Sequence, residues 1–295
     1  MEIRRLTTGI SSWLLLILLP LILVSCRSLQ PPQKAEQRIS EPVKVEAERF
    51  FEAAAQGDLE QIRELLDRNP DLLEARDPSG WNALSYAAWG AHPMVHEYLI
   101  RQGAEGNLYT EAALGPWQSF LERLDTNPIG VDSRDVKLKA PPLIWAVRSG
   151  NQAGCEVLVS RGADLIARDR QGNTVLHHAA MMNRLELLDY FLSIGIDVNT
   201  ENQRRQTALH LVAASGIYEA CRMLIDQGAS LQAADDEGNT PLHIAAERGY
   251  FELCEYFLFL GAPAEVQNDR GQTPHDLAVE GGYDRVAQLL SARSR

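Results

Sequence analysis

A regular period runs through the C-terminal half of this chain. Four threonines, Thr174, Thr207, Thr240 and Thr273, follow one another at intervals of 33 residues. Four glycines keep the same interval, and these are Gly162, Gly195, Gly228 and Gly261. A period of this length is typical of solenoids, in which one helical hairpin cannot bury its apolar face alone and stacks on its neighbours. The sequence therefore predicts an all-helical array of stacked units.

The segments that begin at the four threonines align as TVLHHAA, TALHLVAA, TPLHIAA and TPHDLAV. At these residues the sequence resembles the ankyrin repeat, which has a TPLHxAA helix start and a Gly-Ala-Asp turn after its second helix. The resemblance covers about residues 46–295. It implies an all-α ankyrin-repeat solenoid of about eight units including caps, with short hairpin loops projecting on one side.

Elementary physical chemistry supports this pattern. Threonine is a favourable N-cap, and proline suits the first helical position that follows it, as in Thr240-Pro241. The alanine pair allows two helices to approach closely. Gly228 and Gly261 fit the left-handed position that ends a helix.

The earlier units are less regular. PPLIWAVRSG at 141–150 falls one period before Thr174, and NALSYAAWG at 82–90 keeps the same frame. Between them the spacing is 59 residues, and the stretch 111–135 repeats 52–77 at this same offset. We therefore expect a shortened third unit. The ankyrin-repeat domain, 46–295, is predicted to comprise irregular units at 46–135, regular units at 136–269 and a C-terminal cap at 270–295.

The N-terminus has the anatomy of an export signal. Arg4 and Arg5 precede an almost wholly apolar run at 13–24, which is short for a membrane-spanning helix. The tetrad Leu23-Val24-Ser25-Cys26 ends the run and resembles the bacterial lipobox, in which the cysteine is lipidated after cleavage. Residues 1–25 are accordingly predicted to be a lipoprotein signal peptide. An ordinary signal peptide, a membrane anchor with an incidental cysteine and a twin-arginine signal are the alternatives.

Residues 26–45 are predicted to be the lipidated Cys26 followed by a flexible tether. The segment is polar, contains Pro31, Pro32 and Pro42, and has no apolar periodicity. In the Gram-negative system that the tetrad resembles, aspartate after the cysteine retains a lipoprotein at the inner membrane. Arg27 therefore favours the outer membrane, with the repeat domain facing the periplasm.

Charge excludes some partner classes. Lys plus Arg is 28 and Asp plus Glu is 40, so the formal net charge is −12. Nucleic acid and anionic lipid headgroups both require a basic field, and neither is expected as the main partner. Four cysteines in 295 residues are also too few for a disulfide framework.

The histidines and cysteines do not predict a metal site. His177, His210 and His243 share one register, and the family resemblance implies a structural role for them. Neighbouring repeats stand about 10 Å apart, which is too far for one zinc ion with bonds of about 2 Å. His178 has no carboxylate or cysteine at ligand spacing. The cysteines at 155, 221 and 254 share a register with a leucine, so they are expected to be free thiols in the core.

No catalytic motif, phosphate-binding loop or cofactor site is recognisable, and no small-molecule substrate is expected. Ankyrin repeats hold partners on their loop tips and first helices, so register predicts a contact surface. Its members are Trp81, Trp89, Arg148, Arg170, Gln171, Asn173, Met181, Met182, Arg204, Gln206, Asp236, Glu237, Glu247 and Arg248. Trp81, like the adjacent Trp145, has the alternative of filling a gap in the core.

These observations favour a non-enzymatic protein-binding scaffold, carried as a lipid-anchored lipoprotein of the bacterial envelope. Its partner is expected to be another protein. One alternative is a secreted effector that binds host proteins. Another is a metal-binding or enzymatic repeat protein.

Overall fold

The structure is a computed structural model, and it describes residues 41–293. The predicted signal peptide, Cys26 and most of the predicted tether lie outside the described residues. Contacts group residues 45–295 into one unit, to which the following description refers. None of the helices in the described part combines the length and the hydropathy that a membrane crossing requires.

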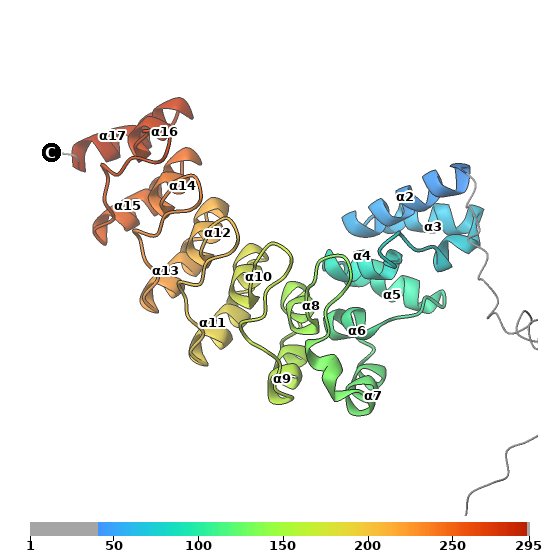
Figure 1. Ribbon diagram of the computed structural model, residues 1–295. Helices are drawn as coiled ribbons and strands as arrows, with labels where there is room; N and C mark the ends of the chain where they lie inside the picture. The colour runs from blue at the N-terminus through green and yellow to red at the C-terminus, as the bar shows by residue number, and fades with distance from the viewer. Residues whose placement is uncertain (1–40, 294–295) are drawn as a thin grey trace, which may run out of the picture. The chain divides into compact units, whose positions relative to one another are not determined.

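The described chain forms sixteen α-helices in eight consecutive pairs, which we call units 1 to 8 (Figure 1). The pairs are α2 (Glu41–Gln56) with α3 (Leu59–Arg68), α4 (Ala83–Trp89) with α5 (Pro93–Arg101), α6 (Leu108–Leu114) with α7 (Trp117–Thr126), α8 (Pro142–Ser149) with α9 (Gln152–Ser160), α10 (Val175–Met181) with α11 (Leu185–Ser193), α12 (Ala208–Ser215) with α13 (Tyr218–Asp226), α14 (Pro241–Glu247) with α15 (Phe251–Phe259), and α16 (Pro274–Glu280) with α17 (Asp284–Arg293). The prediction of an all-helical array of about eight units is confirmed.

Threonine and histidine together organise the starts of the regular first helices. In unit 6 the main-chain N–H and the hydroxyl of Thr207 lie 3.1 and 2.9 Å from His210 Nδ1. His210 Nε2 faces the carbonyls of Ala233 and Asn239 in the next loop, at 3.1 and 3.2 Å. Because Nδ1 accepts and Nε2 donates, the imidazole is neutral. Each such histidine therefore ties its own helix to the following unit, as the family resemblance implied.

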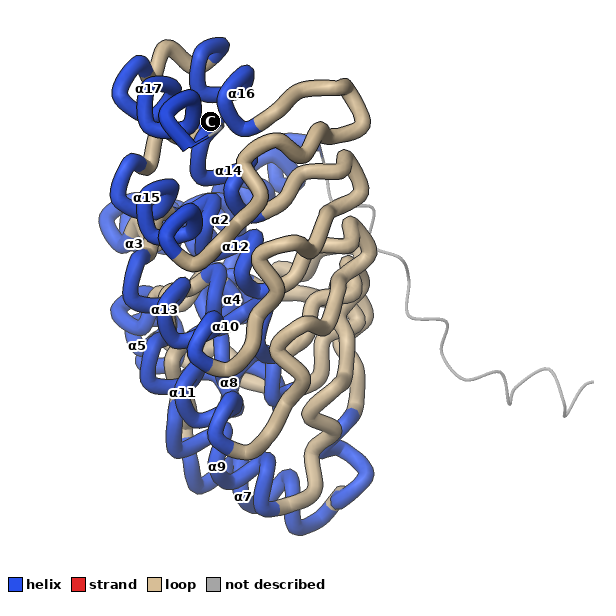
Figure 2. The backbone as a smooth tube through the Cα atoms, turned by 90° about the vertical axis from the view of Figure 1, so that its left-hand side faces the viewer, coloured by secondary structure: helices blue, strands red, loops and turns tan. Residues whose placement is uncertain are grey.

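The long loops between units project on one side of the helices (Figure 2). Their tips are joined in series by main-chain hydrogen bonds, since the N–H of Gln203 donates to Gln171 O at 3.0 Å and that of Asp236 to Arg204 O at 2.9 Å. Two 3-10 turns, Pro70–Glu74 and Pro128–Asp132, lie in the loops before α4 and α8. The loop tips therefore form one connected platform.

The core is continuous from Trp81 and Ala88 of unit 2 to unit 8. Small and aliphatic side chains fill it, and Cys155, Cys221 and Cys254 lie within it as free thiols, as expected. Burial raises the pKa of Cys221 and of Cys254 to about 12. A separate buried cluster lies in units 1 and 2, between Ala47 and Ala104.

Unit 3 is the irregular point, as the sequence spacing predicted. Only residues 102–107 join α5 to α6, whereas residues 161–174 join α9 to α10. The shortening thus removes the long loop that would lie between units 2 and 3. Helix α8 of unit 4 contacts α4 of unit 2 as well as its neighbour α6.

Candidate functional site

The predicted contact residues differ in exposure. Those exposed are Arg170, Gln171, Met181, Arg204, Asp236, Glu247 and Arg248, and those partly exposed are Trp89, Arg148, Met182, Gln206 and Glu237. Trp81 is 6% exposed and Asn173 is 3% exposed. The assignment of these two residues to an accessible surface is therefore wrong, and the alternative of a core position for Trp81 and Trp145 is correct.

Asn173 is buried because its amide binds its own loop. Its Nδ2 lies 3.2 Å from both Asp169 Oδ2 and Gln171 Oε1, and its Oδ1 accepts a hydrogen bond from Asn202 at 2.9 Å. These bonds hold two loops together and leave the amide oxygen and nitrogen engaged within the protein. Asn173 consequently stabilises the platform through hydrogen bonds within the protein.

Seven of the exposed and partly exposed residues line two cavities near the loops. One, of about 190 Å³, is lined by five of the predicted residues, namely Arg204, Gln206, Glu237, Glu247 and Arg248. The other, of about 240 Å³, lies one unit earlier and includes Gln171, Met181 and Arg204. The structure therefore brings the predicted residues of units 5 to 7 together along the loops.

Trp81 and Trp89 lie in a separate aromatic cluster, which we define as Trp81, Tyr86, Trp89, Tyr109 and Trp145. Trp145 is central, with ring centroids 5.0 Å from Trp81, 5.1 Å from Trp89 and 5.8 Å from Tyr109. Tilted and edge-to-face ring pairs at such distances contribute about 0.5–1.5 kcal/mol each beyond their buried area. The cluster joins units 2 and 4 where the long loop is missing.

Lys137 spans the same gap from the loop before α8. Its ammonium Nζ lies 2.9 Å from Asp77 Oδ2 and 2.5 Å from the Tyr86 hydroxyl. It also stands over the Trp81 and Tyr86 rings, 4.8 and 4.3 Å from their centroids. Burial raises the pKa of Asp77, but hydrogen bonds from Lys137 and the Trp81 main chain outweigh it and hold that pKa below its usual value. Lys137 thus acts as a brace between two loops that are not neighbours in the array.

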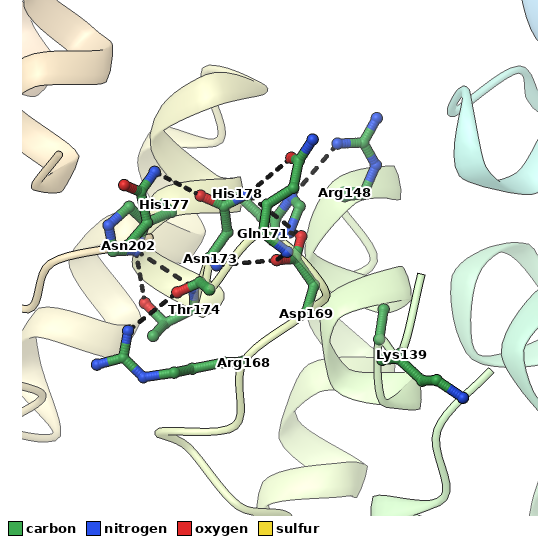
Figure 3. Close-up of polar contacts among 12 residues, drawn as sticks. Lys139, Arg148, Arg168, Asp169, Gln171, Asn173, Thr174, His177, His178 and Asn202 are labelled. Atoms are coloured by element: carbon green, nitrogen blue, oxygen red, sulfur yellow. Dashed lines mark hydrogen bonds and ion pairs between the residues drawn. The ribbon is translucent and has the colours of Figure 1, made fainter. Parts of the chain in front are cut away.

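Arg148 is held by a buried polar network (Figure 3). His178 Nε2 donates to Asp169 Oδ2 at 2.9 Å, so its unprotonated Nδ1 accepts from Arg148 Nη1 at 3.3 Å. Arg148 Nε donates to Trp89 O at 3.1 Å, and its guanidinium lies 4.1 Å from the Trp89 ring centroid. The guanidinium is therefore fixed in position before any partner arrives.

Burial sets the ionisation of this network. It lowers the pKa of His178, and the nearby Arg148 charge lowers it further against the opposing effect of Asp169. Burial also lowers the pKa of Arg148 to about 10, with Asp169 opposing this shift and Arg184 adding to it. At neutral pH the network accordingly holds a neutral His178 between a carboxylate and a guanidinium.

Sequence reasoning missed the contacts of Lys137, Tyr86 and His178. A signal was nevertheless present, because Tyr86 follows Asp77 by nine residues and His178 follows Asp169 by nine. In both units the polar side chain binds the aspartate of its own loop, at 2.8 and 2.9 Å. The corresponding positions of units 6 and 7, residues 211 and 244, are Leu and Ile.

The described residues are arranged to display side chains on a surface. Within residues 41–293 no three histidine, cysteine or acidic side chains are grouped so that they could hold a metal ion. The repeated histidines are turned into the stack, and each faces a main-chain carbonyl of the next loop. The arrangement can present side chains to another molecule along a preformed platform.

Comparisons with known proteins agree with this architecture. A model of the family "Ankyrin repeats (3 copies)" matches residues 118–202 and 195–268, which together cover just over half of the chain. The target of rapamycin complex 2 subunit AVO2 of Saccharomyces cerevisiae is 33% identical over 141 residues, covering 44% of this chain and 33% of that protein.

Two further relatives match more weakly. Ankyrin repeat domain-containing protein 40 of Mus musculus is 30% identical over 100 residues, covering 34% of this chain and 28% of that protein. The Arf-GAP with coiled-coil, ANK repeat and PH domain-containing protein 2 of Gallus gallus is 26% identical over 164 residues, covering 55% and 20%. The matched regions span about a third or less of each of these curated relatives. On the residues that the family model matches, the chain belongs to the ankyrin-repeat family.

Proposed function

We propose that this chain is a non-enzymatic protein-binding scaffold whose partner docks on the loop tips and first helices. One observation carries the proposal. Equivalent partly or fully exposed positions of successive first helices hold unlike side chains, namely Trp89, Arg148, Met181, Ala214 and Glu247, on a frame whose buried positions repeat. A repeated frame with a varied surface suits the recognition of one particular partner.

The rigidity of the platform supports this function. Main-chain bonds tie successive loop tips, and amide bonds such as Asn202 to Asn173 and Asn268 to Asn239, both 2.9 Å, reinforce them. A surface that is already ordered loses little conformational entropy on docking. One relative is named as a subunit of a complex, which is compatible with a role in assembly.

A cross-linked pull-down with the full chain as bait tests the proposal. Met181→Asp places a charge on an exposed first-helix position, whereas Phe259→Asp, at a side chain 75% exposed at the end of a second helix, is the matched control. We expect one protein to be retained by the native bait and by Phe259→Asp, and its recovery to fall about ten-fold with Met181→Asp. Loss with Phe259→Asp alone would place binding on the other face and contradict the proposal.

We also propose that Cys26 carries lipid and anchors the protein in the bacterial envelope, facing the periplasm, with the outer membrane favoured by Arg27. Support comes from the apolar run and the tetrad that ends at Cys26. Labelling cells with an alkyne-bearing fatty acid should mark the native chain and not Cys26→Ser, and fractionation should place the label in the outer membrane. Unlabelled protein free in the medium would instead support a secreted effector.

A further inference from the structure

Charge is unevenly distributed over the loop tips. The loops before α8 and α10 carry Arg134, Lys139, Arg168 and Arg170 as exposed residues. Of their four aspartates, Asp132 and Asp164 are exposed, whereas Asp135 and Asp169 are buried. The tip before α14, in contrast, bears Asp236 and Glu237. On a chain of net charge −12, units 4 and 5 therefore present a local excess of outward-facing cations.

These four cations and Arg148 of helix α8 have no acidic partner within the described chain. No carboxylate of residues 41–293 lies within 4.0 Å of Arg134, Lys139, Arg148, Arg168 or Arg170, which we call the basic patch. In later loops, Arg204 pairs with Glu237 at 3.2 Å and Arg270 pairs with the same carboxylate at 3.1 Å. Arg204 and Arg270 are thus neutralised locally, and the cations of the basic patch are not.

The nearby carboxylates are occupied by the fold itself. Asp135 accepts main-chain N–H bonds from Lys137, Leu138 and Ala140 at 2.8–2.9 Å. Asp169 accepts equivalent bonds from Gln171 and Asn173 and also binds His178. Because these bonds draw both carboxylates inward, neither is available to pair with the exposed guanidinium and ammonium groups around it. Figure 3 shows this arrangement for Asp169.

The members of the basic patch are physically continuous. Arg134 donates to the carbonyls of Lys139 and Arg168, and Arg170 Nη2 donates to Val136 O at 3.3 Å. Arg148 lies deeper and connects to the same loops through His178 and Asp169. The cations themselves bond to main-chain carbonyls and to the neutral His178, so these bonds orient them without neutralising their charge.

Exposed apolar side chains lie among the cations of the basic patch. Val136, between Arg134 and Lys139, is 63% exposed, and Met181, on the first helix beside Arg148 in register, is 43% exposed. A matching partner would offer carboxylates interspersed with apolar side chains. An extended protein segment can present this mixture on one face, since every second side chain points to the same side and each of these can be acidic or apolar.

The aromatic rings argue against single-stranded nucleic acid as the occupant. Binding of unpaired bases requires open aromatic faces on which they stack. Arg148 lies over the Trp89 ring, and Trp81 and Trp145 are buried, so the patch offers no such platform among the described residues. The overall negative charge also opposes a phosphate backbone.

We propose that the basic patch binds an extended acidic segment of the partner protein, with carboxylates paired to Lys139, Arg170 and Arg148 and apolar side chains against Val136 and Met181. This inference rests on the proposed scaffold function and names the chemistry of its partner. Complementary charge at the rim accelerates encounter and selects among partners, whereas the recessed Arg148 supplies a preoriented donor.

A phage-displayed library of random 12-residue peptides, selected on the purified full chain, tests the proposal without a known partner. We expect the selected peptides to be enriched in Asp and Glu. The double variant Lys139→Glu/Arg170→Glu should weaken a synthetic selected peptide about ten-fold or more. The matched control Lys44→Glu/Arg49→Glu makes the same charge change at exposed positions of α2 and should leave binding within about two-fold.

Four outcomes would overturn the proposal in distinguishable ways. Peptides without acidic enrichment, lost with Met181→Asp but not with Lys139→Glu/Arg170→Glu, would refute the basic patch and leave the scaffold function intact. Equal weakening by the α2 control would reduce the effect to net charge. Peptides indifferent to every loop-tip and first-helix variant would contradict the scaffold function as well. Displacement of the peptide by oligodeoxythymidine at similar affinity would assign the patch to nucleic acid instead.

Discussion

Units 5 to 7 and units 2 to 4 meet the same packing requirement with different side chains. In the regular units a neutral histidine such as His210 joins its own helix cap to the next loop, and each unit binds only its neighbours. In the irregular units a loop is missing, and Trp145 and Lys137 reach past unit 3 to unit 2. The regularly spaced histidine hydrogen bonds are thus replaced by contacts between aromatic rings and by the interactions of one lysine.

The difference follows from the reach of each interaction. A histidine hydrogen bond spans about 3 Å, and it works only where the next loop stands one repeat away. Indole rings fill a wider gap and bury more apolar area for each residue. The irregular half therefore depends on a few large side chains, whereas the regular half spreads its stability over many equivalent bonds.

Lowering the pH is expected to produce the largest difference in stability between the two halves. Burial lowers the pKa of His177 to about 4 and also lowers the pKa values of His178, His210 and His243, all in units 5 to 7. Below about pH 6.5 the unfolded chain binds more protons than the folded one, so the free energy of unfolding decreases as the pH falls towards 4. His177 alone accounts for about 3 kcal/mol over this interval, and the four together for more.

Hydrogen exchange followed by mass spectrometry at pH 7 and at pH 5 would locate this loss. We expect protection of residues 175–260 to decrease more than that of residues 45–135, after correction for the intrinsic exchange rate. Units 1 to 3 contain one comparable group, His96, whose pKa burial lowers to about 4. Earlier loss of protection around His96 would show that the histidines of units 5 to 7 are not the acid-sensitive element.

Truncation of Trp145 is expected to have the next largest effect. Trp145 is 1% exposed and contacts three other rings, so Trp145→Ala should lower the free energy of unfolding by about 3–5 kcal/mol. The matched control is Leu211→Ala, at the equivalent and partly buried position of unit 6, which should cost about 1 kcal/mol. Urea titration measures both. Equal losses would contradict a special role for the aromatic cluster.

Sequence reasoning was more accurate for the regular half than for the irregular half, because the interactions of the two halves differ in reach. Thr207, the alanine pairs and Gly228 were predictable, because helix caps, close helix contacts and left-handed turns depend on local sequence. The burial of Trp81 was left open, because its neighbour Trp145 belongs to a unit two places further on. No periodic template predicts a contact that skips a unit.

The loop tips show the same limit at the candidate site. Arg170 and Arg204 were expected at the surface and lie there, since register alone places them at the tip. Asn173 has the same kind of position, yet its amide turns inward to Asp169. Which way a short polar side chain turns depends on the neighbouring loop, and a single repeat does not contain that information.

Trp89 remains a predicted contact residue, but its substitution would affect both binding and stability. It packs on Trp81 and Trp145 and supports Arg148 through both its ring and its carbonyl. Met181, exposed and outside the aromatic cluster, is therefore the better position at which to test partner binding.

Removal of the Lys137 brace should have a moderate effect. Lys137→Met retains the apolar stem but deprives Asp77, 10% exposed at its side chain, of its charged partner, so we expect a loss of about 1–3 kcal/mol. In the regular half, Arg204→Met breaks ion pairs whose side chains are roughly half exposed and should cost at most about 1 kcal/mol. Thermal unfolding of both variants compares them. No measurable loss for Lys137→Met would mean that units 2 and 4 are held by the rings alone.

The smallest expected effect distinguishes two ways of starting a first helix. In the irregular unit 3, Asn107 Oδ1 accepts the main-chain N–H groups of Tyr109 and Thr110, both at 3.0 Å, so Asn107→Ala should cost about 1 kcal/mol. In unit 6, Thr207→Val removes only the hydroxyl, because the main-chain N–H of Thr207 still binds His210 Nδ1, and we expect a loss of about 0.5 kcal/mol. Urea titration resolves this difference if the two variants share the native m-value. If Thr207→Val were the more damaging, the hydroxyl would be needed to orient His210. The hydrogen bonds between regular units would then depend on the threonine as much as on the imidazole.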